Sequence, residues 1–452
     1  MVVSWHATFS SWRYGIVLLL CYLPFAGAVA LWLHPSPLPA LFKDFFFVIP
    51  AYCAFWLSQK NAVRVAYVPK SIWVAMVALA FMVAIQSFNP GLASWLVAAI
   101  GAKVWLFYLP LVFLAFEMIE SRDDLIGVLR LLVVIAWIPC TIGILEWLAC
   151  KAFGYVETMS AIYGLAAEGA TQNFASFEIG GEFFRIPSTF SFSTQYFGFT
   201  LSMLVPAYVL TKLDESIGWR VFSAATFCLA MLAAFMSGAR ASYVFVPLLL
   251  VLVFGLEGKF KGSLKVAVVV TMAMSLALYV GGIDMFALYE LVQELFFKYA
   301  DEIARQGLAD AIQMSPLGVG TGMNTGPARY GVDDPENFIG IENYYAKAVV
   351  ELGIPGLLVV VGLFFLIAKE GYRVHSQLRD SGLRSCASAF LAFVVMMALN
   401  SFKGWQLDLD PVNVYFWMFV GFLLKLEYLD LQDSELEDDA VGESYAGTAG
   451  SA

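Results

Sequence analysis

The chain has 452 residues, of which 60% are apolar and only 14% are charged, with a mean hydropathy of +0.76 and a formal net charge of -10. Soluble domains are about half apolar and a quarter charged. A chain this apolar cannot cover itself with polar surface. The composition therefore excludes a soluble globular domain and predicts an all-α integral membrane protein.

Apolar runs of the length that spans a bilayer recur through the sequence, since a spanning helix needs about 20 such residues. The second run is interrupted by Lys43, Asp44 and Pro50, and the eighth is short. We predict about twelve spans, near residues 14–33, 38–57, 71–88, 96–118, 125–149, 190–211, 219–236, 242–256, 264–283, 343–368, 384–402 and 412–429.

The positions of Lys and Arg predict the orientation, because cytoplasmic loops are enriched in these residues. With the N-terminus (residues 1–13) inside, every inner segment holds Lys or Arg, whereas the short outer loops hold only Arg240 and Lys403. We therefore predict a polytopic membrane domain over residues 14–429 with both termini in the cytoplasm.

Three longer segments lie outside the predicted spans. Residues 150–189 and 284–342 are predicted to be outer, periplasmic loops. The second contains "MFALYELVQELFFKYADEIARQGL", whose apolar residues recur at helical spacing opposite charged ones and predict an amphipathic helix. Residues 430–452 are acidic, then small and polar, which predicts a disordered cytoplasmic tail.

Cysteine and histidine patterns indicate neither a disulfide framework nor a metal site. Five of the six cysteines fall within predicted spans, and Cys150 lies alone at the outer edge. The three histidines are scattered over the N-terminal end, a loop and the inner face. We expect no metal and no cofactor.

Candidate functional residues are sought at the outer edge, because ionisable groups in or beside spans are costly and mark functional sites. Arg240 lies in "AAFMSGARASYVFV", where the seventh span turns directly into the eighth. It is either an arginine that extends to lipid phosphates or an anion clamp, since the planar guanidinium fork matches phosphate oxygens.

Three further cations are candidates. Arg185, in "GGEFFRIPSTFSFSTQYFGF", precedes the sixth span and is either an ordinary loop arginine or a ligand. Lys103, in "AAIGAKVWLFYLPL", lies about two turns inside the fourth span and either extends outward or faces a polar cavity. The glycine-rich "SPLGVGTGMNTGPARYGVDDPEN" lacks the strand and the Lys-Ser/Thr of a P-loop, and we interpret it as a shaped loop that presents Arg329.

The order of these features resembles the O-antigen ligase and polysaccharide polymerase superfamily of membrane glycosyltransferases, most clearly over about residues 180–365. In the ligases, His-Asn (or Ser, Gln) is followed by nine residues and then Gly-x-x-Gly. Here Asn343 is followed by nine residues and then Gly353 and Gly356 in "GIPG". The histidine position holds Glu342, and similar Glu-Asn variants occur among polysaccharide polymerases.

The resemblance implies transfer of a glycan from a polyprenyl diphosphate to a sugar hydroxyl. Arg185 and Arg240 map onto the two outer arginines of the family, with Arg329 and Lys103 as further diphosphate ligands. Glu342 is then the base for the acceptor hydroxyl. The implied product is an extracellular polysaccharide, O-antigen or exopolysaccharide, made at the outer face of the inner (cytoplasmic) membrane.

The implied partners are the polyprenyl-diphosphate-linked oligosaccharide, the lipid bilayer, and chain-length-regulating and flippase proteins, with no nucleic acid. Other interpretations stay open. The chain could be a ligase that transfers glycan to a lipid or protein acceptor, or a secondary transporter of twelve spans. Glu342 could be a solvated acidic residue that favours a helix N-terminus.

Overall fold

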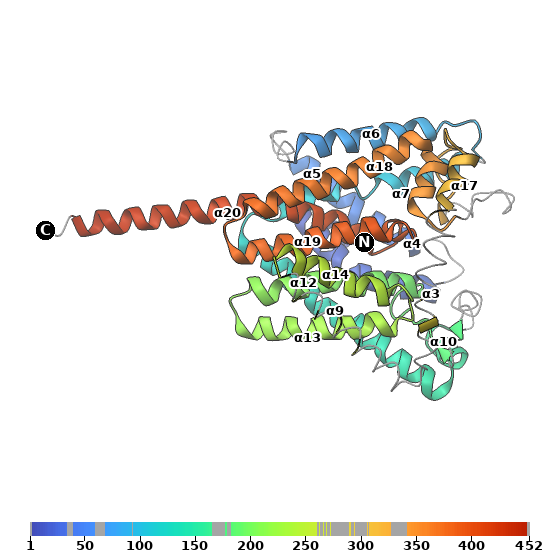
Figure 1. Cartoon of the computed structure of the whole chain (residues 1–452), viewed down its shortest axis with the longest axis horizontal. Coiled ribbons are helices and arrows are strands. Elements are labelled where there is room, and N and C mark those ends of the chain that lie inside the picture. The colour runs from blue at the N-terminus through green and yellow to red at the C-terminus, as the bar shows by residue number, and fades with distance from the viewer. Residues whose placement is uncertain are drawn as a thin grey trace.

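The computed structural model describes residues 2–33, 39–58, 68–92, 94–164, 177–178, 182–259, 307–326 and 341–449, with a few single positions between 262 and 305. These residues form a bundle of helices that run side by side (Figure 1). The regular elements in this part of the chain are helical apart from a two-residue antiparallel ladder between β1 (Phe177–Glu178) and β2 (Glu182–Phe183). The predicted all-α class is confirmed.

Within the described residues, nine helices are long and apolar enough to cross a membrane, so the chain is a multi-pass membrane protein. Two shorter apolar helices coincide with the third and eighth predicted spans. The ninth predicted span and the predicted amphipathic helix lie almost entirely outside the described residues, so the count of twelve stays a prediction. The nine are Trp12–Trp32, Leu41–Ser58, Trp95–Met118, Arg122–Phe153, Ser193–Leu213, Ile217–Met236, Tyr344–Gln377, Ser381–Asn400 and Val412–Asp433.

Several spans are assembled from more than one helical element. The second span continues through a π-helical stretch, η2, which begins at Asp44 directly after Lys43 and is therefore not broken by these charges. The elements are α1 (Val2–Ser10), α2 (Trp12–Tyr22), η1 (Leu23–Phe25), α3 (Ala26–Trp32), α4 (Pro39–Lys43), η2 (Asp44–Val48), α5 (Ile49–Ser58), α6 (Lys70–Gln86), α7 (Trp95–Leu106), α8 (Leu111–Met118), α9 (Arg122–Phe153), α10 (Tyr155–Tyr163), α12 (Ser193–Leu213), α13 (Ile217–Met236), α14 (Ser242–Leu256), α17 (Gly307–Met314), α18 (Tyr344–Gln377), α19 (Ser381–Asn400), η9 (Gln406–Asp408) and α20 (Val412–Ala449).

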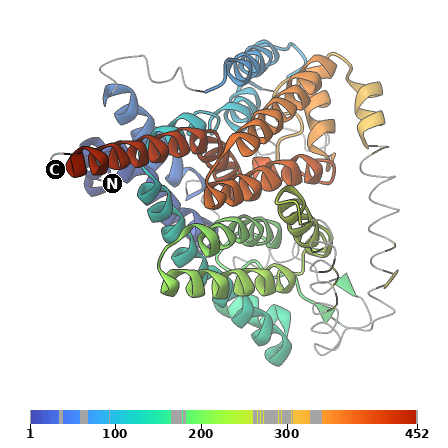
Figure 2. The same ribbon diagram turned by 60° about the vertical axis from the view of Figure 1, so that its left-hand side comes forward.

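The centre of the bundle is α19, which contacts α12, α14, α18 and α20. Figure 2 shows it between α18 and the α12–α13 pair. Aromatic rings fill the seam between α19 and α20, where Phe390 and Phe393 each lie within about 5 Å of the ring of Phe419. At the periphery, α6 exposes apolar side chains such as Phe81, which suits a face turned to lipid.

The C-terminal segment differs from expectation. At the N-terminus, residues before the first span form α1, which packs against α2 and α5. Helix α20 runs to Ala449 and so continues through most of the segment predicted to be disordered. A helix that is already formed can be extended without a new nucleation cost, which the acidic composition alone does not reveal. This extension projects from one end of the bundle (Figure 1).

Candidate functional site

The turn that carries Arg240 (residues 237–241) is joined to the extended segment that carries Arg185 (residues 184–190, the Arg185 strap). The backbone N–H of Ile186 donates to the carbonyl of Ser237 at 3.0 Å. Gly238 has φ +70°, and a Cβ there would lie 2.2 Å from the carbonyl oxygen of Phe184. Only glycine permits this approach, so the local sequence "SGAR" places the two arginine-bearing segments in contact.

The Arg185 strap also contacts Tyr155, the first residue of α10. The hydroxyl of Tyr155 donates to the carbonyl of Arg185 at 3.1 Å. The ring of Tyr155 stacks on Phe184 with centroids 5.7 Å apart. Arg185 and Arg240 are both half-buried, so their side chains have limited freedom while remaining accessible.

Glu342 stands at the start of α18, and the residue after it caps the helix. The side chain of Asn343, which is fully buried, accepts from the backbone N–H groups of Tyr345 and Ala346 at 2.9 and 3.1 Å. This is the standard way in which an N-cap satisfies free helix amides. The capping role therefore belongs to Asn343, whereas the side chain of Glu342 is exposed.

The loop between α19 and α20 (residues 401–411) brings a further cation to Glu342. The backbone N–H of Tyr344 donates to the carbonyl of Ser401 at 2.9 Å, so the start of α18 lies against this loop. Lys403 follows two residues later and is half-buried. The sequence showed Lys403 as one of two basic residues in short outer loops, but no motif singled it out.

The electrostatics of Lys403 show that the four charges gather in one place. Burial lowers the pKa of Lys403 from its usual 10.5 to about 8; the negative charge of Glu342 opposes this effect, and the positive charges of Arg185 and Arg240 reinforce it. We call Arg185, Arg240, Glu342 and Lys403 the charge cluster. Among the described residues, the cluster comprises three cations and one carboxylate, and fixed cations of this kind attract an anion.

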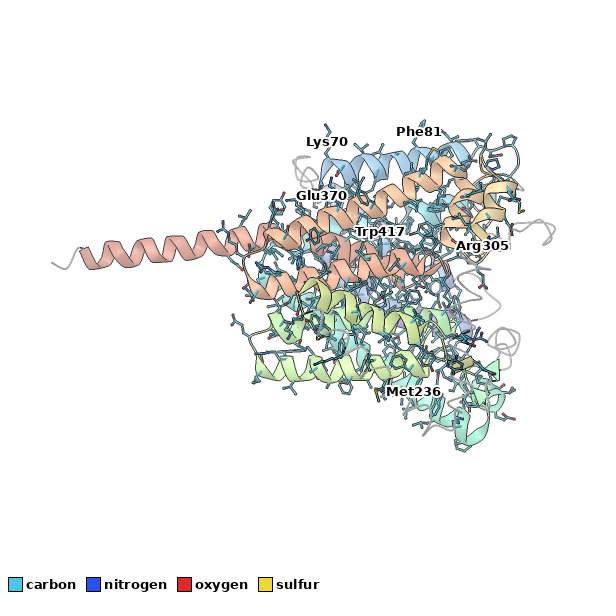
Figure 3. The ribbon with its side chains drawn as sticks, viewed as in Figure 1. Lys70, Phe81, Met236, Arg305, Glu370 and Trp417 are labelled. Atoms are coloured by element: carbon cyan, nitrogen blue, oxygen red, sulfur yellow. The ribbon has the colours of Figure 1, made fainter. Side chains whose placement is uncertain are left out.

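The cluster lies at one end of the bundle. Figure 3 labels Met236, the last residue of α13 before the Arg240 turn, toward the same end as Arg305, while Lys70 lies toward the other end. The extended part of α20 projects from the end opposite to Met236 (Figure 3).

The predicted glycine motif of α18, Gly353 and Gly356, lies where the glycine-rich stretch contacts this helix. Gly353 has φ +77° and interrupts the helix, and a Cβ there would lie 2.6 Å from the carbonyl carbon of Leu317. The glycine-rich stretch enters this break, because Ile354 N–H donates to the carbonyl of Pro316 at 2.9 Å and Val319 N–H donates to that of Val350 at 2.8 Å. Gly356 lies in the helix one turn later. Gly353 therefore shapes the backbone that supports the start of α18.

Two of the predicted diphosphate ligands are not placed in the cluster. Lys103 pairs with Asp44 at 2.5 Å. This pair belongs to an ion-pair network in which Lys43 contacts Asp410 at 2.7 Å and Tyr108 donates to Asp44 at 2.8 Å. Arg329 lies outside the described residues.

A second buried network supports the α19–α20 loop from α18. Lys347, fully buried, pairs with Asp408 and lies 4.6 Å from the ring centre of Trp105. Glu351, one turn along α18, accepts from Trp105 Nε1 at 2.7 Å and from Thr325 Oγ1 at 2.9 Å. Sequence reasoning missed these residues, although ionisable groups four apart within an apolar helix are a signal that could have found them.

Comparisons with known proteins add no identity. No protein-family model matches the sequence, and a comparison with curated proteins finds no match either.

Proposed function

We propose that the protein is a membrane glycosyltransferase that joins polyprenyl-diphosphate-linked repeat units into an extracellular polysaccharide. The observation that supports this proposal is the gathering of Arg185, Arg240, Lys403 and Glu342 from four separate segments. A diphosphate needs fixed positive charge, and an attacking hydroxyl needs a base. The charge cluster offers both.

The reaction follows from the roles of these groups. The acceptor sugar oxygen forms a bond to the anomeric carbon of the donor, while the bond from that carbon to the diphosphate oxygen breaks. The diphosphate leaves with the electron pair, and its growing negative charge faces the cations of Arg185, Arg240 and Lys403. The hydroxyl proton passes to Glu342. One negative charge appears on the leaving group as one disappears from Glu342, so the total charge within the site stays constant.

The proposed place of reaction is the outer face of the inner membrane, because the charge cluster lies at the end of the bundle that the distribution of Lys and Arg predicts to face outward. The ligase alternative uses the same charges and differs in the acceptor. The transporter alternative has one observation in its favour, the ion-pair network of Lys43, Asp44, Lys103 and Asp410. Transporters use such buried ionisable groups, but here each charge has an opposite partner.

Deletion of the gene separates the three functions by what the cell accumulates. Single lipid-linked repeat units without long chains are expected for a polymerase. Long polymer that is not attached to its acceptor would favour a ligase. Glycans of unchanged length and attachment would contradict both and favour transport. Restoration by the unaltered gene, but not by one encoding Arg240→Ala, ties the result to the charge cluster.

A further inference from the structure

Glu146 of α9 is a buried carboxylate that the proposed reaction does not use. Its side chain is only 3% exposed. One carboxylate oxygen accepts from the hydroxyl of Tyr163 at 2.6 Å, and the other accepts from the backbone N–H of Ser188 at 2.8 Å. With both oxygens occupied and almost no exposure, Glu146 cannot serve as a base for a substrate. A charge in a spanning helix is costly and is found where it has a specific partner.

The partner, Ser188, has an unusual backbone. Its φ is +53°, and it is the one non-glycine residue with positive φ in the described part of the chain. Non-glycine residues seldom adopt this region, and they do so where surrounding contacts hold them there. Here the side-chain hydroxyl donates to the carbonyl of Pro139 at 2.7 Å, while the amide donates to Glu146.

The whole Arg185 strap is non-helical, so its backbone groups need partners other than a helix of its own. Its first half is bonded to the Arg240 turn through Ile186 and to Tyr155 through the carbonyl of Arg185. Its second half is bonded to α3, where Ala28 N–H donates to the carbonyl of Thr189 at 2.8 Å. Glu146 holds the bend between these halves, three residues after Arg185.

We propose that Glu146 is a positioning residue that, through the amide of Ser188, fixes the strap so that Arg185 lies in the charge cluster. The consequence for activity rests on the proposed function, whereas the anchoring itself does not. Glu146→Gln keeps the shape of the side chain but removes its negative charge and leaves one acceptor oxygen in place of two, so neither the Tyr163 hydroxyl nor the Ser188 amide retains a charge-assisted bond to it.

Hydrogen–deuterium exchange tests the anchoring without any reference to activity. In the full-length protein in detergent or nanodiscs, peptides that cover residues 184–190 of Glu146→Gln should exchange roughly tenfold faster, as expected for loss of a charge-assisted hydrogen bond. Tyr163→Phe removes the hydroxyl that contacts both Glu146 and the carbonyl of Ser188, so it should also speed exchange in the same peptides. Unchanged exchange of the strap in both variants would overturn the proposal.

Asp214→Asn is the matched control. Asp214 is also a buried carboxylate, and it accepts two hydrogen bonds from Arg130 at 2.7 and 2.8 Å between α9 and α12. Its replacement should lower stability while leaving exchange of the strap as in the unaltered protein. Equal acceleration of the strap in Asp214→Asn would show that Glu146 acts through general stability, and would also overturn the proposal.

Binding of inorganic pyrophosphate tests the link to Arg185. Glu146→Gln should weaken binding roughly tenfold, as expected for loss of a charge-assisted hydrogen bond, and should cause no further weakening when Arg185 is already Ala. Equal weakening in both backgrounds would contradict positioning through Arg185. If the unaltered protein fails to bind pyrophosphate while the strap still exchanges faster in Glu146→Gln, the anchoring stands and the proposed diphosphate site fails.

Discussion

The backbone N–H of Ile186 donates to the carbonyl of Ser237 at 3.0 Å. This bond joins the segment that carries Arg185 to the turn that carries Arg240. The bond joins backbone groups, so it fixes the segments whichever side chains they carry. Substitution of either arginine should therefore alter the charge of the site with little change in fold.

Arg240 is expected to act through its planar fork as well as its charge. Arg240→Lys keeps the charge but loses the second parallel hydrogen bond to phosphate oxygens, so polymerisation should fall by roughly tenfold; Arg240→Ala should fall by about 100-fold. Activity is measured as repeat units added per unit of membrane protein. Arg220→Lys, near the far end of the helix that precedes the Arg240 turn (α13), is the control. Full activity of Arg240→Ala at normal protein level would dismiss the clamp.

Glu342 is predicted to be the base. Glu342→Gln keeps the size of the side chain and leaves the Asn343 cap intact but cannot take a proton, so turnover should fall by about 100-fold or more while donor binding changes little. Single-turnover kinetics with a lipid-linked donor separate the two effects. Glu370→Gln, farther along α18, should behave as the unaltered protein. A Glu342→Gln enzyme that works at the parental rate would assign the base to another group.

Lys403 should give the proposed reaction a pH dependence. Since its pKa in the folded protein is about 8, it is mainly charged at neutral pH, and donor binding should weaken as pH rises through about 8. Lys403→Met should bind donor weakly and lose this step in the profile. A step of equal size in Lys403→Met would mean that another group titrates there.

Lys403 should also lower stability at neutral pH. Its folded pKa lies below the unfolded value near 10.5, so the stability linked to its neutral form is present above that value and is lost as pH falls through about 8. Thermal unfolding of Lys403→Met at pH 7 should consequently show no loss of stability. A lower melting temperature of Lys403→Met than of the unaltered protein would indicate that Lys403 stabilises the fold.

The buried pair of Lys347 and Asp408 should be non-additive in stability. Lys347→Met alone leaves a buried carboxylate without its cation and should cost about 3–5 kcal/mol, whereas Lys347→Met with Asp408→Asn should recover most of the loss. Denaturant unfolding of the four proteins measures the coupling. If the changes in unfolding free energy of the two single variants add up to that of the double variant, the two side chains do not stabilise the fold through their interaction.

The carboxylate of Asp408 should also make the stability of the protein depend on pH. Burial raises the pKa of Asp408 from 3.8 to about 6, with Lys347 opposing the shift. Because the folded pKa is the higher one, the stabilising contribution is fully present below about pH 3.8 and is lost as pH rises through about 6. This part of the pH dependence should be absent from Asp408→Asn.

Orientation is tested by cysteine labelling in a protein whose native cysteines have been replaced. Ala309→Cys, on exposed α17, should react with an impermeant thiol reagent added to intact cells with a permeabilised outer membrane. Ser376→Cys, exposed near the other end of α18, should react only after the inner membrane is opened. Labelling of Ser376→Cys from outside would place the charge cluster in the cytoplasm and contradict the proposed function.

Most of the spans that the structure describes were predicted to within a few residues, because length and apolarity are what a bilayer demands of each helix on its own; α18, predicted to end at residue 368, runs to Gln377. The Arg240 turn was recognisable for a similar reason, since it depends on neighbours in the chain, whereas the cap at Asn343 was not predicted. The pairing of Lys103 with Asp44 could not be predicted in this way. The sequence gives the depth of a residue in the membrane but not the direction in which its side chain points.

Contacts between distant segments account for the rest. Nothing in "GILEWLAC" indicates that Glu146 meets the amide of Ser188, and nothing near Lys403 indicates that it lies beside Glu342. Similarly, "GVGTG" is readable as a loop, but its insertion into the break at Gly353 depends on a backbone approach between segments that lie far apart in sequence. Pairings of this kind are set by how the helices pack.

Assembly of the charge cluster from segments at 185, 240, 342 and 403 has a consequence for biosynthesis. A membrane protein emerges from its N-terminus onward, so the two arginines can meet once α14 has been inserted, while the carboxylate of Glu342 and the cation of Lys403 are still to be made. Until the α19–α20 loop has emerged, no subset of segments holds the complete group. A chain truncated before this loop should therefore be catalytically silent under the proposed function.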